Sequence, residues 1–294
     1  MIQDRGRRTA TADGAMLADP AALGKLAMPG AVTDGVAATE AVAGTARVGA
    51  TEGVAATAEV AATAGIPVPD APVAKIFEPA FWADRGELQE AAGGRGSAWF
   101  ISSVACPWVL RHYRRGGLIA RLSTDRYVWA GEARVRAFAE WRLLHHLFGR
   151  GLPVPAPVAA RYQREGFFYR CDLITRRIAG AEPLSSLLAR GALAGASWRS
   201  IGAAIARVHA AGADHADLNA HNILLDGDGV VSVIDFDRGR LRNGGSWMRR
   251  NLARLQRSLV KVTRALPPDR FDAAAWQLLL AGYADASRAH AAVI

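Results

Sequence analysis

The stretch that decides the fold is His215-Ala-Asp-Leu-Asn-Ala-His-Asn222, followed directly by Ile223-Leu-Leu-Asp-Gly-Asp-Gly-Val-Val-Ser-Val-Ile-Asp-Phe-Asp237. Two short apolar runs, at 222–225 and 230–234, flank the turn-forming sequence Asp226-Gly-Asp-Gly229. Apolar runs on either side of such a turn predict an antiparallel hairpin. The hairpin places the start of its first strand beside the end of its second strand.

This hairpin is expected to bring polar side chains together at one end. Asn222 begins the first strand, Asp235 ends the second, and Asp217 lies on the loop that leads in. Carboxylate and amide oxygens are ligands that hard divalent cations prefer. A surface hairpin with polar flanks would explain the turn, but not the whole spacing. His-x-Asp-x-x-x-x-Asn followed by Ile-Asp-Phe resembles the catalytic loop and metal-binding Asp of the protein-kinase-like superfamily.

Composition narrows the class of protein. The 294 residues carry 36 Lys and Arg against 27 Asp and Glu, a formal net charge of +9, which indicates an anionic partner. The two cysteines, Cys106 and Cys171, form no Cys-x-x-Cys pair, so a disulfide scaffold or zinc cluster is not expected. No apolar run reaches the roughly 18 residues of a membrane-spanning helix, so any membrane contact should be peripheral.

The chain is expected to divide into three parts. Residues 1–70 are rich in Ala, Gly, Thr and Val, and a segment beginning Gly-Val-Ala-Ala-Thr nearly repeats at 35 and at 53. Such small side chains bury too little surface to offset chain entropy, which predicts a disordered extension or a misassigned translation start. Residues 71–175 are predicted to form the smaller, nucleotide-binding lobe. Residues 176–294 are predicted to form the larger lobe with the catalytic loop, metal site and basic helix.

The predicted small lobe contains three further candidate elements. Gly94 and Gly96 lie in a Gly-rich turn before an apolar run, where backbone amides could approach phosphate oxygens. An ordinary hairpin turn explains them equally well. Arg111 lies on the strand expected at 107–113, where kinase-like proteins carry a phosphate-holding Lys. Glu140 lies on the helix expected at 132–148, so the resemblance pairs it with Arg111. The alternatives are a surface Arg and a solvated Glu.

Further strands at 158–162 and 166–174 should complete a five-stranded sheet, and a short helix is expected around 81–89. Residues 175–180 are the expected hinge. In the larger lobe, the spacing of apolar residues predicts helices at 184–189, 198–211 and 272–286. Nine cations and no Asp or Glu occur between Arg238 and Arg264. This segment is predicted to be a helix with a basic face, either merely solvated or directed at an anionic surface.

Five stretches together resemble one family within this superfamily. They are Arg111-His-Tyr-Arg-Arg-Gly-Gly117, Phe138-Ala-Glu-Trp-Arg-Leu-Leu144, Gly151-Leu-Pro-Val-Pro155, His215 to Leu225, and Ile234-Asp-Phe-Asp-Arg238. In this order they are similar to the 3-deoxy-D-manno-octulosonic acid (Kdo) kinases of Gram-negative bacteria, over about residues 75–285. The resemblance implies an α+β, two-lobed protein-kinase-like fold with a small antiparallel-sheet lobe and a mainly helical lobe.

The resemblance also implies an activity and the roles of several residues. The activity is transfer of the ATP γ-phosphate to the 4-hydroxyl of Kdo on Kdo-lipid IV(A), during lipopolysaccharide core synthesis. Asp217 would accept the hydroxyl proton, and Asn222 and Asp235 would hold Mg²⁺. Arg111 and Glu140 would form a phosphate clamp, and the two glycines of the predicted turn would cover the phosphates. His215 would brace the loop.

The same resemblance predicts a peripheral protein at the cytoplasmic face of the inner membrane, with the glycolipid and an anionic surface as partners. Nucleic acid and an obligate protein partner are not expected. Asp237 stands where protein kinases carry the Gly of Asp-Phe-Gly. A protein substrate and a phosphorylation switch are therefore not expected. Whether Asp237 binds metal is left open. The alternatives are a heptose or aminoglycoside phosphotransferase, and a non-catalytic lipid-A-binding pseudokinase.

Overall fold

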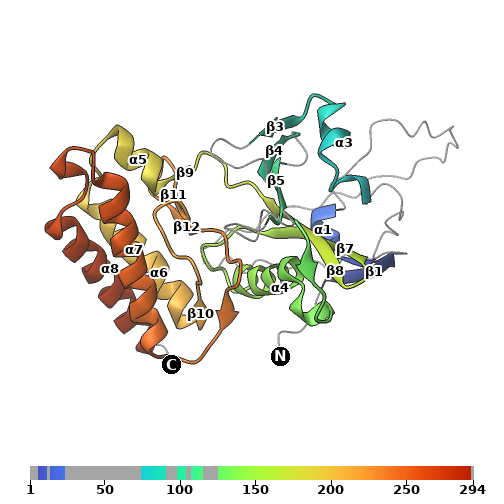
Figure 1. Ribbon diagram of the computed structural model, residues 1–294. Coiled ribbons are helices and arrows are strands. Elements are labelled where there is room, and N and C mark those ends of the chain that lie inside the picture. Colours follow the sequence, from blue (N-terminus) through green and yellow to red (C-terminus); the bar gives the residue numbers. More distant parts are fainter. Residues whose placement is uncertain are drawn as a thin grey trace, which may run out of the picture.

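A computed structural model describes residues 6–11, 14–23, 74–90, 98–103, 107–114 and 125–292. It has two lobes, an antiparallel sheet with a single long helix packed on it and a mainly helical lobe, as Figure 1 shows. The α+β, two-lobed fold predicted from the sequence is therefore confirmed. The lobe boundary predicted at residue 175 stays a prediction, although the sheet's last strand ends at Arg176.

The sheet of the smaller lobe has eight antiparallel strands among the described residues, with the order β1-β2-β7-β8-β5-β4-β3 and with β6 also paired to β8. Its strands are β1 (Arg7–Thr11), β2 (Gly14–Ala18), β3 (Leu88–Glu90), β4 (Ala98–Ser102), β5 (Pro107–His112), β6 (Tyr127–Val128), β7 (Pro157–Glu165) and β8 (Phe168–Arg176). The five-stranded sheet expected from the sequence was too small. The helix expected at 81–89 was also misplaced, because α3 (Pro79–Ala83) ends early and is followed by β3.

Residues 7–11 and 14–23 form two strands and a short helix, so the prediction of a disordered extension was wrong for these residues. β2 pairs with the edge of β7 from Ala18↔Ala159 to Gly14↔Gln163, and β1 pairs with β2. Ala15 and Leu17 are fully buried against the core that contains helix α4 (Arg136–Phe148). The segment ends in the short helix α1 (Pro20–Leu23). Most of the rest of the predicted extension lies beyond the ranges that the structure describes.

Each face of the sheet carries a hydrophobic cluster. Successive side chains of a strand point to opposite faces, so one strand contributes to both clusters. In β2, Ala15 and Leu17 face the core on the side of α4, whereas Met16 and Ala18 join a second cluster with Trp82 of α3. A turn at Glu132–Arg134 precedes α4, which therefore begins later than expected. Its residues Phe138, Trp141 and Leu144 are buried at the predicted helical spacing. The α4 helix thus packs against β7 and β8, and β8 pairs with β5, the strand that carries Arg111.

The helical lobe contains the predicted hairpin. The structure confirms this prediction, because β11 (Ile223–Leu225) pairs with β12 (Val231–Val233). Its helices are α5 (Leu184–Arg190), α6 (Gly195–Ala210), α7 (Ser246–Thr263) and α8 (Ala273–Ala291), with a short helical turn at Pro268–Arg270. Three two-residue strands complete it, β9 (Glu182–Pro183), β10 (Ala213–Asp214) and β13 (Arg240–Leu241). No helix in the described part of the chain is long and apolar enough to cross a membrane.

Helices α6 and α8 touch through their backbones. A Cβ atom on Gly202 would lie 1.9 Å from the carbonyl oxygen of Leu279, and one on Gly282 would lie 2.1 Å from that of Arg199. Only glycine fits at such a contact. The β10 strand follows α6 closely and leads into the loop 215–222, so this helix pair supports the loop.

The N-terminal hairpin gives a test of the fold. Leu17→Ala should lower the free energy of unfolding by about 2–5 kcal/mol, because the site loses buried methyl groups and leaves a cavity. Denaturant unfolding measures this change. Arg7→Ala, at an exposed position of the neighbouring strand, is the matched control and should leave stability nearly unchanged. Equal stability of the two variants would show that β2 is not part of the folded core.

Candidate active site

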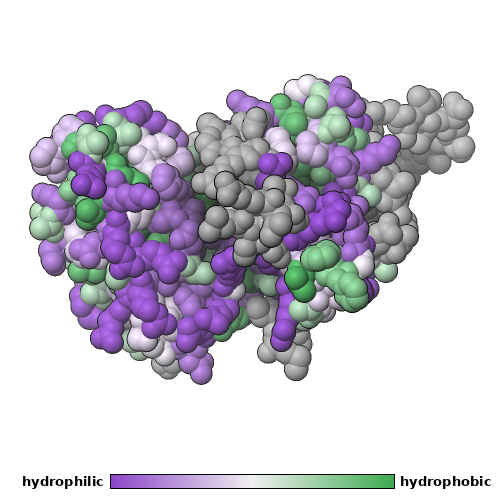
Figure 2. Space-filling view, viewed as in Figure 1, coloured by the Kyte–Doolittle hydropathy of each residue, from purple (hydrophilic) through white to green (hydrophobic). Residues whose placement is uncertain are grey.

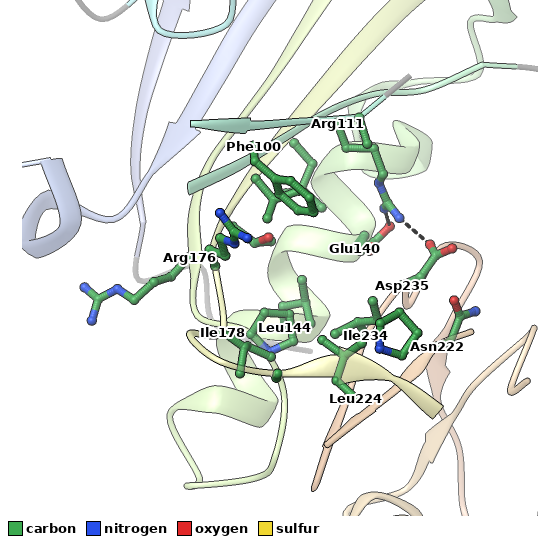
Figure 3. A pocket seen from close by; sticks show the side chains of 18 residues that line it. Phe100, Arg111, Glu140, Leu144, Arg176, Ile178, Asn222, Leu224, Ile234 and Asp235 are labelled. Carbon is green, nitrogen blue, oxygen red and sulfur yellow. Dashed lines mark hydrogen bonds and ion pairs between the residues drawn. The ribbon is translucent and has the colours of Figure 1, made fainter. Parts of the chain in front are cut away.

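A cavity of about 310 Å³ lies between the two lobes. Figure 3 shows Phe100 on the sheet side and Leu224 and Ile234 of the hairpin on the other, with Ile178 from the connecting segment beside them. Arg111, Glu140, Asn222 and Asp235 line its polar end. The cavity therefore joins an apolar slot to a charged end. The predicted hinge residues Thr175, Arg176, Arg177 and Ile178 also line it.

Arg111 is the centre of the charged end. Its guanidinium contacts the carboxylates of Glu140, from α4, and of Asp235, from the end of the hairpin, and it donates a 2.8 Å hydrogen bond to the hydroxyl of Tyr113. Tyr113 in turn donates a 2.5 Å hydrogen bond to Glu140. The ion pair predicted between Arg111 and Glu140 is therefore present. Its role in holding phosphate stays a prediction.

The two carboxylates around Arg111 have opposite pKa shifts. Burial raises the pKa of Glu140, and this effect exceeds the stabilisation of its ionised form by Arg111. The pKa of Asp235 is lowered, because the guanidinium of Arg111 stabilises its charged form more than partial burial destabilises it. Asp235 therefore remains a carboxylate at neutral pH. It also has a positive φ of 63°, which is uncommon for a residue other than glycine.

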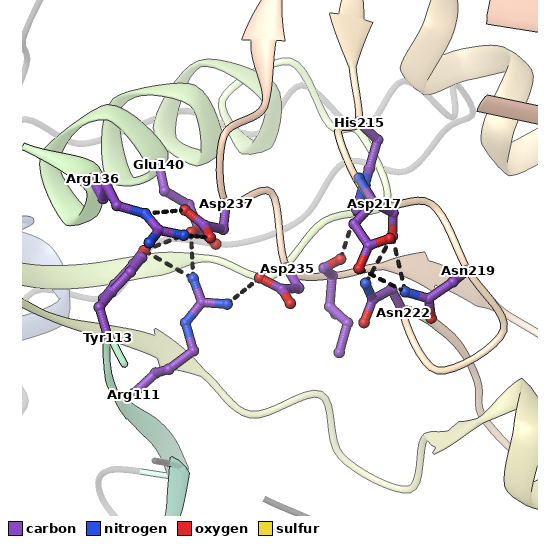
Figure 4. Close-up of polar contacts among 11 residues, drawn as sticks. Arg111, Tyr113, Arg136, Glu140, His215, Asp217, Asn219, Asn222, Asp235 and Asp237 are labelled. Carbon is purple, nitrogen blue, oxygen red and sulfur yellow. Dashed lines mark hydrogen bonds and ion pairs between the residues drawn. The ribbon is translucent and has the colours of Figure 1, made fainter. Parts of the chain in front are cut away.

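The hairpin places Asn222 next to Asp235, as predicted. The amide nitrogen of Ile234 donates to the carbonyl oxygen of Asn222 at 2.9 Å, so Asp235 follows directly after the paired position. The side-chain nitrogen of Asn222 donates to the backbone carbonyl of Asp217 at 3.0 Å, as Figure 4 shows, which directs its nitrogen to the loop and leaves its oxygen available. One carboxylate and one amide oxygen thus lie at the charged end of the cavity.

This donor set fits Mg²⁺ bound together with a phosphate ligand. Mg²⁺ is usually held by one or two protein oxygens, with substrate phosphates and water as the remaining ligands. The described residues contain no group of three or more His, Cys, Asp and Glu that would hold a metal by themselves. The site therefore suits a metal that arrives with a nucleotide rather than a permanently bound ion.

Asp217 lies on the exposed side of the loop, with its side chain 65% accessible. One carboxylate oxygen accepts a hydrogen bond from Asn219 at 3.2 Å, and the other lies 3.6 Å from the guanidinium of Arg254, on α7. An exposed carboxylate held in this way can accept a proton from a bound hydroxyl group.

His215 braces this loop, in agreement with its predicted role. Its Nε2–H donates to the carbonyl of Ile234 at 2.9 Å, and its Nδ1 accepts the backbone N–H of Asp217 at 3.2 Å. Both ring nitrogens are therefore used by one neutral tautomer. Burial lowers the pKa of His215, which favours that neutral form. The imidazole thus links the loop to the hairpin strand that carries Asp235.

Beneath the loop lies a buried polar network that the sequence analysis did not identify. Asn251 of α7 donates to Asp214 at 3.1 Å and accepts from the backbone N–H of His215 at 3.1 Å and from Nε2 of His209 at 3.3 Å. Burial lowers the pKa of His209 to about 4, so its ring is neutral at pH 7. The signal was present: Asn251 interrupts the i, i+4 row of Trp247, Leu255 and Leu259, which are buried.

The carboxylate of Asp237 is held by a cation from the smaller lobe. Arg136 at the start of α4 holds both of its carboxylate oxygens, one of them from Nε at 2.9 Å. Asp237 thus forms an ion pair that joins the two lobes. Sequence reasoning missed Arg136 because its partner is 101 residues away. Gly94 and Gly96 belong to the part of the chain that the structure leaves undescribed, so their predicted role stays untested.

Comparisons with known proteins found a matching family model and several similar proteins. The family model described as "Lipopolysaccharide kinase (Kdo/WaaP) family" matches residues 79–283. A protein described as 3-deoxy-D-manno-octulosonic acid kinase from Xanthomonas axonopodis pv. citri (strain 306) is 51% identical over 190 residues, which are 64% of this chain and 76% of that protein. Proteins with the same description from Xylella fastidiosa (strain M12) and Stenotrophomonas maltophilia (strain K279a) are each 50% identical over 188 residues, or 64% of this chain and 75% of theirs.

The network beneath the loop can be tested through Asn251. Asn251→Ala should lower the free energy of unfolding by about 2–4 kcal/mol, because buried groups of Asp214, His209 and His215 lose their partner. Thermal or denaturant unfolding measures this loss. Gln256→Ala, at an exposed position on the same helix, is the control. If both variants unfold alike, Asn251 does not support the loop.

Proposed function

Because the chain belongs to the lipopolysaccharide kinase (Kdo/WaaP) family, as its sequence resemblance predicted, we propose that it transfers the γ-phosphate of ATP to the 4-hydroxyl of the Kdo residue of Kdo-lipid IV(A). The observation that carries this proposal is that Asn222 and Asp235 line the charged end of the inter-lobe cavity, while a hydrogen bond from Asn222 holds the loop that carries Asp217. The chain is thus a kinase with a candidate base and a candidate metal site in one place. A pseudokinase would not require this arrangement.

The inter-lobe cavity supports ATP as the donor. Its apolar slot, between Phe100 and the hairpin residues Leu224 and Ile234, suits a purine ring, and the connecting segment at Arg177–Ile178 also lines it. The phosphates would then extend toward Arg111, whose planar guanidinium can hold two phosphate oxygens. Mg²⁺ at Asn222 and Asp235 would offset negative charge on the transferred group.

The chain's own residues position the acceptor and the proton. Asp217 accepts the proton of the sugar hydroxyl. The hydroxyl oxygen forms the new bond to phosphorus, while the bond from phosphorus to the ADP oxygen breaks. Asn219 and Asn222 hold the loop in place, and His215 fixes it to the hairpin. In phosphoryl transfer most of the rate comes from positioning and electrostatic stabilisation, which this rigid frame supports.

For its location, we propose peripheral attachment to the cytoplasmic face of the inner membrane, where such a glycolipid acceptor would be presented. Arg257 and Lys261 on α7 and Arg264 at its C-cap are exposed and follow one another at i+4 and i+3, so they form a basic stripe. Each can contribute about 1 kcal/mol near an anionic surface. Replacing all three with Gln should weaken co-sedimentation with anionic vesicles at low salt; binding equal to wild type would contradict attachment through this stripe.

The acceptor assay tests the proposed activity. Purified protein with Mg-ATP and Kdo-lipid IV(A) should give a product heavier by one phosphate in mass spectrometry. Heptose and aminoglycoside acceptors run in parallel separate the two other kinase functions, and absence of ATP turnover with every acceptor would favour a non-catalytic protein.

Asp217→Asn keeps the shape of the side chain but removes the proton acceptor. We expect kcat to fall by at least about 10²-fold, with ATP affinity largely kept. Steady-state kinetics and nucleotide titration measure the two effects separately. Near-normal turnover in this variant would remove Asp217 from its proposed role.

The metal site predicts a different pattern. Asp235→Ala and Asn222→Ala should each abolish or strongly reduce Mg²⁺-dependent turnover, because each removes an oxygen ligand. Titration of activity with Mg²⁺, with EDTA as the zero point, measures the requirement. Asp226→Ala, on the turn at the opposite end of the hairpin, is the control. Activity that survives EDTA, or an active Asp235→Ala variant, would place the metal elsewhere.

A further inference from the structure

A second cavity, of about 220 Å³, lies in the helical lobe beside the loop and shares no lining residue with the inter-lobe cavity. It is formed by the segment after Asp237 and by the first half of α7. Its charged lining residues are Asp214, Arg238, Arg240, Arg242, Arg250 and Arg254. Figure 2 shows that the face over α7 and β10 is largely hydrophilic. We call the five cationic residues the arginine pocket.

The positive charge of the arginine pocket is only partly balanced. Asp214 is its one lining carboxylate, and it is contacted by Arg242 at 3.1 Å and by Arg240 at 3.7 Å. Within the described ranges, Arg238 and Arg250 have no carboxylate at ion-pair distance. The hydroxyl of Ser246 accepts a 2.7 Å hydrogen bond from Arg250. Five guanidinium groups against one carboxylate in a concave site favour the binding of an anion.

The arginine pocket adjoins the atom that would accept the proton. Arg254 donates to the backbone carbonyl of Ala216, and the same terminal nitrogen lies 3.6 Å from the carboxylate of Asp217. One guanidinium group therefore contacts both the pocket and the proposed base. A ligand anion held here would lie on the acceptor side of the loop, away from the nucleotide cavity.

We propose that the arginine pocket is a subsite for a phosphomonoester carried by the acceptor glycolipid, and that it aligns the sugar hydroxyl at Asp217. This inference rests on the proposed function for the identity of the acceptor. Guanidinium groups suit the task, because each can form two parallel charge-assisted hydrogen bonds to phosphate oxygens. The binding energy of this remote group would then orient the reacting hydroxyl. In this proposal the arginine pocket binds the phosphate of the acceptor, whereas the basic stripe binds the anionic membrane surface.

The first experiment compares two water-soluble acceptors. Deacylated Kdo-containing acceptor is prepared with its phosphates and with the phosphates removed, so that membrane binding plays no part. For Arg238→Gln and Arg250→Gln, the ratio of KM for the phosphorylated acceptor to KM for the dephosphorylated acceptor should rise on the order of tenfold for each residue, as expected for loss of one charge-assisted contact. The KM for ATP should stay as in wild type.

Arg249→Gln is the matched control, because it removes the same charge from the position next to Arg250 without lining the pocket. Its KM ratio should equal that of wild type. The proposal is overturned if the pocket variants raise KM equally for both acceptors, or if the control raises the ratio as much as they do. A loss seen only with acceptor embedded in anionic vesicles would also overturn it, since that result assigns the pocket to the membrane surface.

A second readout separates this proposal from the proposed function. With the nucleotide cavity filled by saturating Mg-ADP, inorganic phosphate at constant ionic strength should raise the Tm of wild type and of Arg249→Gln, but less so that of the Arg238→Gln/Arg250→Gln double variant. If no Kdo acceptor is phosphorylated and this difference persists, the proposed function fails while the phosphate site stands. If the double variant responds as wild type does, the phosphate site fails, whatever the activity. A phosphate response without any change in KM ratio overturns the acceptor subsite.

Discussion

The partly buried guanidinium of Arg111 makes the interaction on which the rest of the site depends. It is held by Glu140, Tyr113 and Asp235, which come from helix α4, from the residue after strand β5 and from the end of the β11–β12 hairpin. A buried cation is costly unless it is paired and hydrogen-bonded, so these elements must meet with little freedom. Strand β5 of the sheet positions Arg111, and helix α4, which packs on the sheet, positions Glu140. Asp235 completes the arrangement from the other lobe, where it is also available to a metal.

The parts of the structure that could be predicted from sequence are those in which local pattern decides the outcome. The hairpin from 222 to 235 follows from its turn and apolar runs, and Glu140 faces Arg111 because the helix and strand periodicities orient both side chains. The β2 strand could not be predicted in this way, because it stands in a segment rich in small residues and its partner strand, β7, lies far along the chain. The Arg136–Asp237 and Asn251–Asp214 contacts were missed for a related reason. Each joins residues far apart in the sequence, and no local pattern identifies the partner.

The nine cations after Asp237 illustrate what composition alone cannot resolve. In the sequence they form one uniform basic segment, yet the structure divides them between the arginine pocket and the exposed positions along the rest of α7. Arg254, one of the pocket cations, also contacts the loop at Ala216 and Asp217. Net charge therefore indicates that an anionic partner exists, while side-chain placement distinguishes a defined phosphate ligand from a diffuse surface. The same distinction explains why replacing cations on this helix without regard to position would confound catalysis, acceptor recognition and membrane attachment.

The close backbone approaches at Gly202 and Gly282 have a consequence for how the protein tolerates genetic change. A single added methyl group at either position would meet a backbone carbonyl of the opposite helix, and neither helix can yield without moving its partner. The α6 helix leads into β10 and the loop, and His209 near its end also meets Tyr283 of α8 at 2.9 Å. A glycine-to-alanine allele at position 202 would therefore disturb the loop from a distance. In a genetic screen it would be classed with active-site alleles, although the altered residue touches neither nucleotide nor sugar.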